Sequence, residues 1–200
     1  MHTLLITNRL ILRRLLKTDA DCLFKLDNDP DVMRYINGGI PTPRDIFERD
    51  ILPAFLHVDE RFPRFGFWAA IEKHTREFLG WFSFRPDDNA SGNVTLGYRL
   101  CKAAWGNGFA TEGARALIDK GFAELGVNRV TATTYQDNLG SIRVMEKVGM
   151  TLVRRFRLTQ SDLIKTDTHH VSSLELWDGD DVEYAIDRAE WKCQQQEGAQ

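Results

Sequence analysis

Hydrophobic positions in the first 60 residues change from a strand pattern to a helical one. Residues 9–16 are rich in Leu and Ile and predict a strand. The run Thr18-Asp19-Ala20-Asp21 is typical of a helix cap and predicts a helix through Leu26. Asp29-Pro30 is expected to end that helix. A second helix is predicted over residues 46–56, with an apolar face made of Ile46, Phe47, Ile51, Phe55 and Leu56.

Residues 65–100 have the shorter period of β-strands. Three runs, at 65–71, 78–84 and 94–100, are β-branched or aromatic and are separated by charged or Gly/Asn-rich turns. In the last run apolar residues occupy the even positions from Val94 to Leu100. Gly97 between them suggests a bulge or a close backbone approach. We expect three consecutive antiparallel strands.

The second half of the chain predicts helices alternating with strands. A strong helix begins just after Gly106-Asn107-Gly108, and its buried face is unusually small: Ala110, Gly113, Ala114, Leu117, Ile118 and Gly121. A strand over 129–135, a helix over 138–147 and strands over 152–158 and 182–186 follow. Residues 160–180 receive no assignment, and residues 194–200 are expected to be a disordered tail. Together these elements predict a mixed α/β (α+β) fold with about seven strands.

The composition is that of an ordinary globular protein and favours one domain. The 200 residues are 42% hydrophobic and 28% charged, which argues against disorder and against a disulfide scaffold. Residues 1–193 are therefore expected to form a single domain. The net charge of -3 provides no global field to attract nucleic acid, so no direct nucleic-acid partner is expected.

Cysteine usage and the hydropathy pattern address the compartment. Cys22, Cys101 and Cys193 are three in number and far apart, without CxxC spacing, which fits a reducing, cytoplasmic location. Arg9 and Arg13 interrupt the N-terminal apolar run too early for a signal peptide, and no later run approaches membrane-spanning length. We expect a cytoplasmic protein without a membrane partner. Both a monomer and a homodimer remain open.

The glycine pair before the long helix carries the clearest chemistry. A strand that runs into Gly106-Asn107-Gly108 and then into a helix gathers unpaired main-chain N–H groups and the positive end of the helix dipole. Such a point binds phosphate oxygens, although a simple turn explains an isolated glycine pair equally well. A P-loop needs Lys-Ser/Thr where this chain has Phe109-Ala110. A Rossmann fingerprint needs a third glycine in an N-terminal βαβ unit, so both of these loops are excluded.

Four segments together resemble the GNAT superfamily of N-acetyltransferases. They are LGYRL at residues 96–100, WGNGFATE at 105–112, NLGS at 138–141 and EKVGM at 146–150. The resemblance covers nearly the whole chain and is strongest to the branch that includes the RimJ and RimL ribosomal-protein N-acetyltransferases. That branch uses acetyl-CoA. The resemblance implies a single GNAT-type domain with a twisted, mostly antiparallel sheet that splays at the Gly97 strand and carries helices on both faces.

The same resemblance implies an acetyl-CoA site built largely from main chain. Its pyrophosphate loop comprises Trp105, Gly106, Asn107, Gly108, Phe109, Ala110 and Thr111. The pantetheine arm fills the gap beside the splayed strand and pairs with backbone near Tyr98 and Leu100. Asn138 contacts the pantetheine or the adjoining backbone, and it is also an ordinary helix N-cap. The Ser141 hydroxyl hydrogen-bonds the departing thiolate.

Three positions depart from the family pattern. Trp105 stands where the phosphate loop has Arg or Gln, which should alter affinity without abolishing binding, because main-chain N–H groups hold the phosphate. Met145 stands where many relatives carry a Tyr general acid, so a tyrosine-assisted mechanism is not expected. Thr95 stands where relatives often carry a Glu base. The general base is not identified; its candidates, each more commonly a surface residue, are His57, Glu60 and Glu175.

Two further groups of residues carry weaker signals. His169-His170 lacks additional Cys or His spacing and acyl transfer needs no metal, so no metal site is expected. Four aromatic residues lie on the predicted strands, where core packing explains most of them better than an acceptor pocket does. They are Trp68, Trp81, Phe82 and Phe84.

The predicted function is transfer of acetyl from acetyl-CoA to a primary amine by direct attack in a ternary complex. The acceptor is either a protein N-terminal α-amine or a small-molecule amine. Five acidic residues either hold its ammonium or simply face solvent: Asp59, Glu60, Asp178, Asp180 and Asp181. The alternative function is a catalytically weak acyl-CoA-binding or ribosome-associated module with the same fold, which the missing Tyr and Glu keep open.

Overall fold

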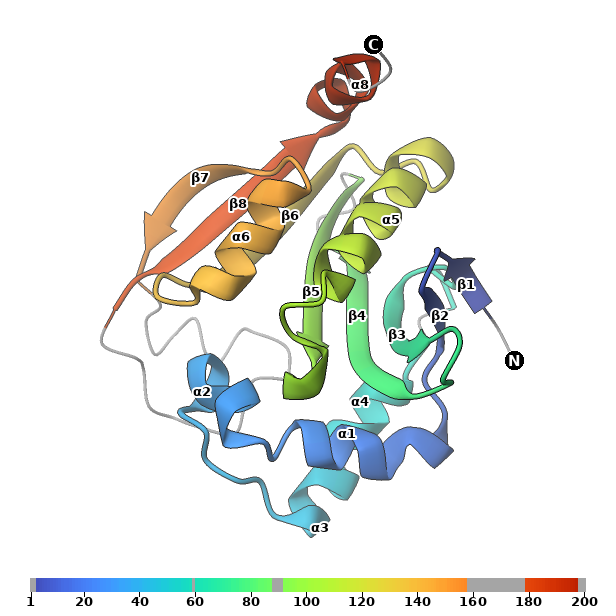
Figure 1. Cartoon of the computed structure of the whole chain (residues 1–200), viewed down its shortest axis with the longest axis vertical. Coiled ribbons are helices and arrows are strands. Elements are labelled where there is room, and N and C mark those ends of the chain that lie inside the picture. The colour runs from blue at the N-terminus through green and yellow to red at the C-terminus, as the bar shows by residue number, and fades with distance from the viewer. Residues whose placement is uncertain (1–2, 59, 88–91, 158–178, 198–200) are drawn as a thin grey trace.

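A computed structural model describes residues 3–58, 60–87, 92–157 and 179–197 (Figure 1). Its strands form one eight-stranded sheet in the order β1-β2-β3-β4-β5-β6-β8-β7. The strands are β1 (Thr3–Ile6), β2 (Leu10–Arg14), β3 (Gly66–Glu72), β4 (Phe78–Pro86), β5 (Asn93–Leu100), β6 (Arg129–Tyr135), β7 (Thr151–Phe156) and β8 (Asp181–Asp187). The helices are α1 (Ala20–Leu26), α2 (Pro30–Asn37), α3 (Arg44–Ile46), α4 (Leu52–Leu56), α5 (Phe109–Glu124), α6 (Leu139–Lys147) and α8 (Arg188–Glu197). Short 3-10 turns, η1 (Lys17–Asp19) and η3 (Lys102–Ala104), and a π-helical stretch, η2 (Phe47–Ile51), complete the described elements.

The pairing of the sheet confirms the predicted mixed α/β domain. Among the described strands, β5 and β6 run parallel and every other neighbouring pair is antiparallel. A parallel pair needs a crossover connection, and α5 supplies it between β5 and β6. The β5–β6 junction is therefore the place where the otherwise antiparallel sheet changes its direction.

Helices cover both faces of the sheet, and neighbouring strand residues divide between two cores. On one face, where α5 and α6 lie in front of the strands in Figure 1, Phe82 packs in the same cluster as Leu117 of α5. On the other face, Trp81 packs in a second cluster with Phe55 of α4. Because side chains alternate along a strand, two adjacent residues of β4 contribute to opposite cores. The expected helices on both faces are confirmed.

The strand that the sequence pattern missed is β1. It pairs antiparallel with β2 across a tight connection closed by a hydrogen bond from Thr7 N to Leu10 O (2.9 Å). Its four residues are too short for a convincing alternation of apolar and polar positions. The hairpin brings Arg9, at its turn, close to the first turn of α5.

Asp29 and Pro30 begin a helix that the sequence analysis did not predict. Asp29 is the N-cap of α2, and its carboxylate accepts hydrogen bonds from the main-chain N–H groups of Asp31 (3.0 Å) and Val32 (3.4 Å). Pro30 occupies the first helical position, where no N–H is required. The dipeptide ends α1, as predicted, but it also starts the next helix.

Of the two alternatives predicted for Gly97, a bulge or a close backbone approach, the structure excludes the bulge. β4 and β5 pair without a register shift, with Gly97 opposite Ser83. The register irregularity lies one strand pair away, between Ala70 and Ile71 of β3 and their partners on β4. A Cβ on Gly97 would lie 2.6 Å from Ser83 Oγ, so a facing side chain, not a bulge, requires glycine here.

The chain between Gln194 and Glu197 is helical, where a disordered tail was predicted. Helix α8 extends through Glu197. Gln194 Nε2 donates to Gly149 O (3.1 Å), and Trp191 Nε1 donates to Asp119 Oδ1 of α5 (2.7 Å). These contacts are hydrogen bonds rather than an apolar stripe, so hydrophobic periodicity did not reveal the helix.

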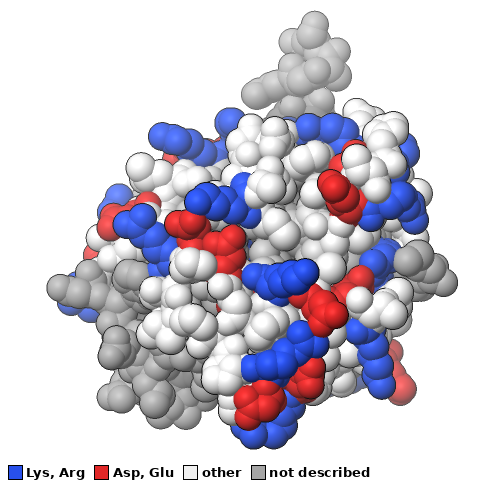
Figure 2. Space-filling view, turned by 60° about the horizontal axis from the view of Figure 1, so that its bottom comes forward, with Lys and Arg blue, Asp and Glu red and all other residues white. Residues whose placement is uncertain are grey.

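Charged side chains intermingle on the face shown in Figure 2, without a large patch of one sign. Several pair with a carboxylate from a neighbouring helix or turn, as Arg44 does with Asp21 and Lys102 does with Asp31. None of the helices that the structure describes has the length and hydrophobicity needed to cross a membrane.

Candidate active site

The parallel strands β5 and β6 separate after a short paired stretch. Asn93, Val94 and Thr95 pair with Arg129, Val130 and Thr131, and the pairing stops there although both strands continue. The remaining residues of β5, from Leu96 to Leu100, are paired on one side with β4. Main-chain groups of β5 beyond Thr95 therefore have no partner on β6, and we call this unpaired region between the two strands the gap. The predicted splay of the Gly97 strand is confirmed.

The N-terminus of α5 opens at the end of the splayed strand. Gly108 is its N-cap, with φ of 80°, a left-handed conformation that glycine adopts without strain. No side chain caps this end among the described residues. The first main-chain bond of the helix runs from Glu112 N to Gly108 O (3.0 Å), which leaves the N–H groups of Phe109, Ala110 and Thr111 without an acceptor in the described part of the chain.

The buried face of α5 brings this helix close to the sheet. A Cβ on Gly113 would lie 2.2 Å from the Phe82 ring, and one on Gly121 would lie 2.7 Å from the Phe84 ring. The small residues on this face therefore allow an approach that larger side chains would prevent, as predicted. The body of α5, at Gly113 and Gly121, consequently packs directly on the sheet.

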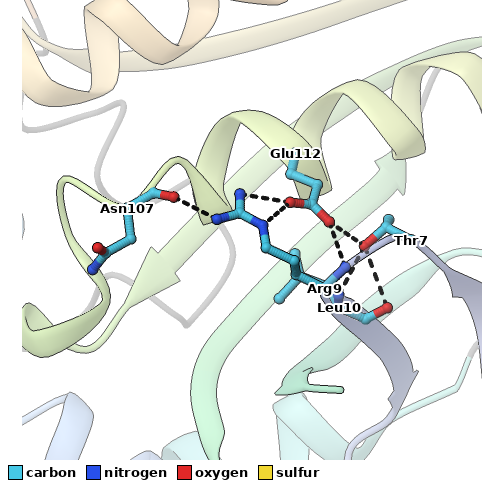
Figure 3. Close-up of polar contacts among 5 residues, drawn as sticks. All are labelled: Thr7, Arg9, Leu10, Asn107 and Glu112. Carbon is cyan, nitrogen blue, oxygen red and sulfur yellow. Dashed lines mark hydrogen bonds and ion pairs between the residues drawn. The ribbon is translucent and has the colours of Figure 1, made fainter. Parts of the chain in front are cut away.

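A polar network from the β1–β2 turn braces the first turn of α5 (Figure 3). The Glu112 carboxylate accepts hydrogen bonds from Thr7 Oγ1 (2.6 Å), from Arg9 N (2.9 Å) and from Arg9 Nε (2.6 Å). Arg9 Nη1 donates to Asn107 O (2.8 Å), and the guanidinium lies over the Phe109 ring with 4.6 Å from Cζ to the ring centroid. One arginine thus binds both the glycine loop and the helix that follows it.

The network also keeps Glu112 ionised. Burial acts to raise the pKa of this carboxyl, but the hydrogen bonds from Thr7 and Arg9 and the charge of Arg9 outweigh burial and lower the pKa. A negative charge in the first turn is compatible with the helix dipole. It would also repel an anionic ligand at the same helix end if Arg9 did not neutralise it.

Trp105 connects the glycine loop to the end of β5. Its indole Nε1 donates to Leu100 O (2.8 Å), and its side chain is 47% exposed. The carbonyl that was expected to lie near the pantetheine therefore already accepts one hydrogen bond. Through this hydrogen bond Trp105 ties the glycine loop to the end of the splayed strand.

Two hydroxyl groups meet at the edge of the gap. Tyr98 Oη lies 2.9 Å from Ser141 Oγ and 3.1 Å from Ser141 O, which joins β5 to the first turn of α6. Burial raises the pKa of Tyr98 to about 12, against a smaller lowering by the Ser141 hydrogen bond. The phenol is therefore neutral at physiological pH and is able to donate a proton to a hydrogen bond.

Asn138 closes the N-terminus of α6 with its own side chain. Its Oδ1 accepts from Ser141 N (3.3 Å), and its Nδ2 donates to Thr134 Oγ1 of β6 (3.0 Å). The ordinary capping role is thus confirmed. Contact of Asn138 with the pantetheine stays a prediction. Both the oxygen and the nitrogen of its side-chain amide already have a protein partner.

Helix α2 packs on the opposite face, where Val32 belongs to the core cluster of Trp81, and its Asp31 pairs with Lys102 just after β5. The rings of Tyr35 and Tyr135 stack with centroids 5.9 Å apart, which places α2 against the end of β6. Asp181 pairs in register with Tyr135. Burial, together with the charge of Asp180, raises the pKa of Asp181. A carboxyl and two tyrosines therefore lie at the C-terminal end of β6, which is the open end of the splay.

Several predicted candidates lie elsewhere or outside the described residues. His57 and Glu60 are exposed, and the hydrogen bonds of Ser141 go to Tyr98 and Asn138 and not to them. Met145 is buried in the core. The strand aromatics also belong to the cores, as predicted: Trp68, Trp81, Phe82 and Phe84. Asp59, His169, His170, Glu175 and Asp178 lie outside the described residues.

No group of three His, Cys, Asp or Glu side chains able to hold a metal occurs within the described ranges. The residues that the structure brings together around β5 form two groups. One is the Arg9-braced glycine loop, and the other is the pair Tyr98 and Ser141.

Arg9 and the side chain of Tyr98 were not identified from the sequence. Arg9 is 98 residues from the carbonyl it binds, and Tyr98 is 43 residues from Ser141. No local spacing signals such contacts. The sequence places Tyr98 in the site only through its backbone, and Met145 predicts that no tyrosine assists the reaction. The structure brings a different tyrosine to Ser141 from β5.

Comparison with known proteins identifies relatives of this chain. The family model described as an acetyltransferase (GNAT) domain matches residues 9–151. An uncharacterised N-acetyltransferase of Bacillus licheniformis, p20, is 35% identical over 147 residues, which cover 72% of this chain and 80% of that protein. The FsC-acetyl coenzyme A-N(2)-transacetylase of Aspergillus fumigatus is 31% identical over 179 residues, which cover 84% of this chain and 68% of that protein.

Solved structures share the fold. The RimL ribosomal L7/L12 α-N-protein acetyltransferase, solved in complex with coenzyme A, superposes with a TM-score of 0.71 at 16% identity. The superposition covers 93% of this chain and 98% of that chain. At this identity the likeness extends to the fold alone.

Proposed function

The chain belongs to the GNAT acetyltransferase family and is an acyl-CoA-dependent N-acetyltransferase. On that premise we propose that the acetyl group of acetyl-CoA passes directly to a primary amine in the gap between β5 and β6. The observation that carries the proposal is the hydroxyl pair of Tyr98 and Ser141, 2.9 Å apart, at the edge of this gap. The acceptor is a protein N-terminal α-amine or the amine of a small molecule.

The residues around the gap fit acetyl-CoA. The N–H groups of Phe109, Ala110 and Thr111 suit the pyrophosphate, because they are unpaired within the described structure and lie at the positive end of α5. The unpaired edge of β5 beyond Thr95 suits the amide groups of the pantetheine arm. When bound, acetyl-CoA supplies an activated acyl group as a thioester.

Ser141 and Tyr98 would stabilise the sulfur that leaves. In the arrangement we propose, the Tyr98 proton turns from Ser141 O, 3.1 Å away, to Ser141 Oγ, 2.9 Å away, and the Ser141 hydroxyl donates to the developing thiolate, so the two hydroxyls act in series. The high pKa of Tyr98 keeps its proton in place throughout this step. A tyrosine from β5 thereby assists at the sulfur, where Met145 of α6 has no hydroxyl group.

The amine would enter from the α2 face. Tyr35 and Tyr135 form a wall at that end of the splay, and Asp181 supplies a carboxyl beside it. The raised pKa of Asp181 makes this carboxyl a better proton acceptor than an ordinary aspartate. The attacking nitrogen forms the amide bond, the carbon–sulfur bond breaks, and the nitrogen loses one proton to Asp181 or to water.

Thiol release from acetyl-CoA tests the proposal. The purified protein is assayed against a panel of peptides with free N-termini and of small amines that include polyamines and amino sugars. Turnover on at least one primary amine supports transfer, and the best acceptor identifies its class. Binding of coenzyme A with no turnover on any acceptor would instead support a catalytically weak acyl-CoA-binding module.

A further inference from the structure

We infer that Arg9 is a positioning residue for acetyl-CoA: it lies outside the pyrophosphate loop but holds that loop in the conformation that receives the phosphates. The inference rests on the proposed function, which places the pyrophosphate at the N-terminus of α5. Arg9 comes from the β1–β2 turn and reaches the loop through Asn107 O, at 2.8 Å.

Arg9 fixes the direction of one peptide group in the loop. In a trans peptide the C=O of one residue and the N–H of the next point in opposite directions. Arg9 Nη1 fixes the Asn107 carbonyl toward the β1–β2 turn. The N–H of Gly108 must then point away from Arg9, and within the described structure it has no acceptor. Arg9 therefore helps to set the direction of a donor in the loop.

Arg9 also neutralises a negative charge near the N-terminus of α5. Glu112 is ionised and lies one helical turn from Gly108, where its charge would oppose an incoming phosphate. Arg9 contacts one carboxylate oxygen of Glu112, Oε2, through both Nε and Nη2, each at 2.6 Å, so a two-pronged ion pair neutralises the carboxylate. Because Arg9 neutralises Glu112, the partial positive charge at the N-terminus of α5 remains available to attract an anionic ligand.

Arg9 places a cation beside a loop in which Trp105 stands at the position where the family has Arg or Gln. Trp105 carries no charge, while the Arg9 side chain is 43% exposed beside Gly108, with Nη2 3.4 Å from the position that a Cβ on Gly108 would occupy. A cation from a distant segment therefore lies where the loop itself supplies none. Arg9 acts through the loop and through Glu112, without direct contact with the substrate.

The test compares two acetyl donors in wild-type protein and variants. S-acetyl-pantetheine has the thioester and the pantetheine arm of acetyl-CoA but no phosphate. We expect Arg9→Gln to raise KM for acetyl-CoA about tenfold, with kcat and KM for the amine unchanged. KM for S-acetyl-pantetheine should stay within about twofold. The matched control is Arg129→Gln, which breaks the cross-strand pair of Arg129 with Asp187 at the closed end of the splay. It should leave KM for both acetyl donors unchanged.

A double variant separates charge neutralisation from a structural role. Because Glu112→Gln removes the charge that Arg9 neutralises, Arg9→Gln combined with Glu112→Gln should recover about threefold of the lost affinity for acetyl-CoA. A role in stability alone predicts that the double variant is no better than Arg9→Gln. Arg9→Lys keeps the charge but not the two-pronged geometry, and it should show an intermediate KM even if Arg9→Gln fails to fold.

The outcomes distinguish this inference from the function it rests on. Wild-type protein that transfers acetyl from neither donor would remove the proposed function itself. Wild-type turnover with equal losses on both donors in the Arg9 variants would overturn the role of Arg9 and leave the function standing. A double variant that is no better than Arg9→Gln would likewise overturn it.

Discussion

The two helices that begin at the open end of the sheet start in different ways. Helix α6 is capped by Asn138, whose side chain satisfies Ser141 N and also binds Thr134. Helix α5 begins at Gly108, with no side-chain cap in the described structure, and it is braced from outside by Arg9. At the start of α6 the N–H groups of Leu139 and Ser141 have acceptors, whereas the first three N–H groups of α5 have none in the described structure and are available for a ligand. On the proposed function, α6 positions a side chain and α5 binds an anion.

The largest expected effect comes from placing a negative charge at the open helix end. Gly108→Glu should weaken binding of coenzyme A about 100-fold, because it adds bulk and a like charge where the phosphates bind. Gly108→Gln has nearly the same size and imposes the same strain at a φ of 80°, so it should cost only about tenfold. Titration calorimetry measures both. Equal losses in the two variants would mean that charge at this position does not matter.

The next effect concerns the side chain that α6 positions. Ser141→Ala should lower kcat by roughly 30-fold and leave KM for acetyl-CoA nearly unchanged, since the hydroxyl acts on the thiolate that forms during the reaction. Steady-state kinetics with the best acceptor provides the measurement. A rise in KM without a fall in kcat would place Ser141 in ground-state binding instead.

Tyr98→Phe should have a smaller effect of the same kind, lowering kcat about fivefold, because a neutral hydrogen bond to Ser141 is lost. The pKa of Tyr98 is about 12, so the phenol stays protonated at pH 7 and at pH 9. The ratio of wild-type to variant kcat should therefore be the same at both values. A ratio that collapses toward one between pH 7 and pH 9 would show that Tyr98 ionises in this range.

The smallest expected effect tests the self-capped helix. Asn138→Ala should lower the free energy of unfolding by about 1 kcal/mol, the usual cost of losing an N-cap, and change the affinity for coenzyme A less than about threefold. Urea denaturation and calorimetry supply the two numbers. A large loss of affinity with unchanged stability would assign Asn138 to the pantetheine and would weaken the contrast between the helices.

The local part of this architecture was predictable from sequence, and the tertiary part was not. Periodicity located β3 to β6 and the two helices, and the glycines before Phe109 marked the open end of α5. The short β1 and the Pro-initiated α2 were missed because their signals are few residues long or are shared with helix ends. The contacts of Arg9 with Glu112 and of Tyr98 with Ser141 join segments that are far apart along the chain, and neither residue type is unusual in its local setting.

The central claim is that the open N-terminus of α5, and not the capped N-terminus of α6, binds the phosphates. Adenosine 3′-phosphate 5′-diphosphate, the nucleotide half of coenzyme A, has phosphates but no pantetheine. Titrating it into ¹⁵N-labelled protein and recording amide resonances tests the claim directly. The account predicts that the amides of Gly108, Phe109, Ala110 and Thr111 shift while those of Leu139, Gly140 and Ser141 do not. Shifts confined to the α6 amides would contradict it.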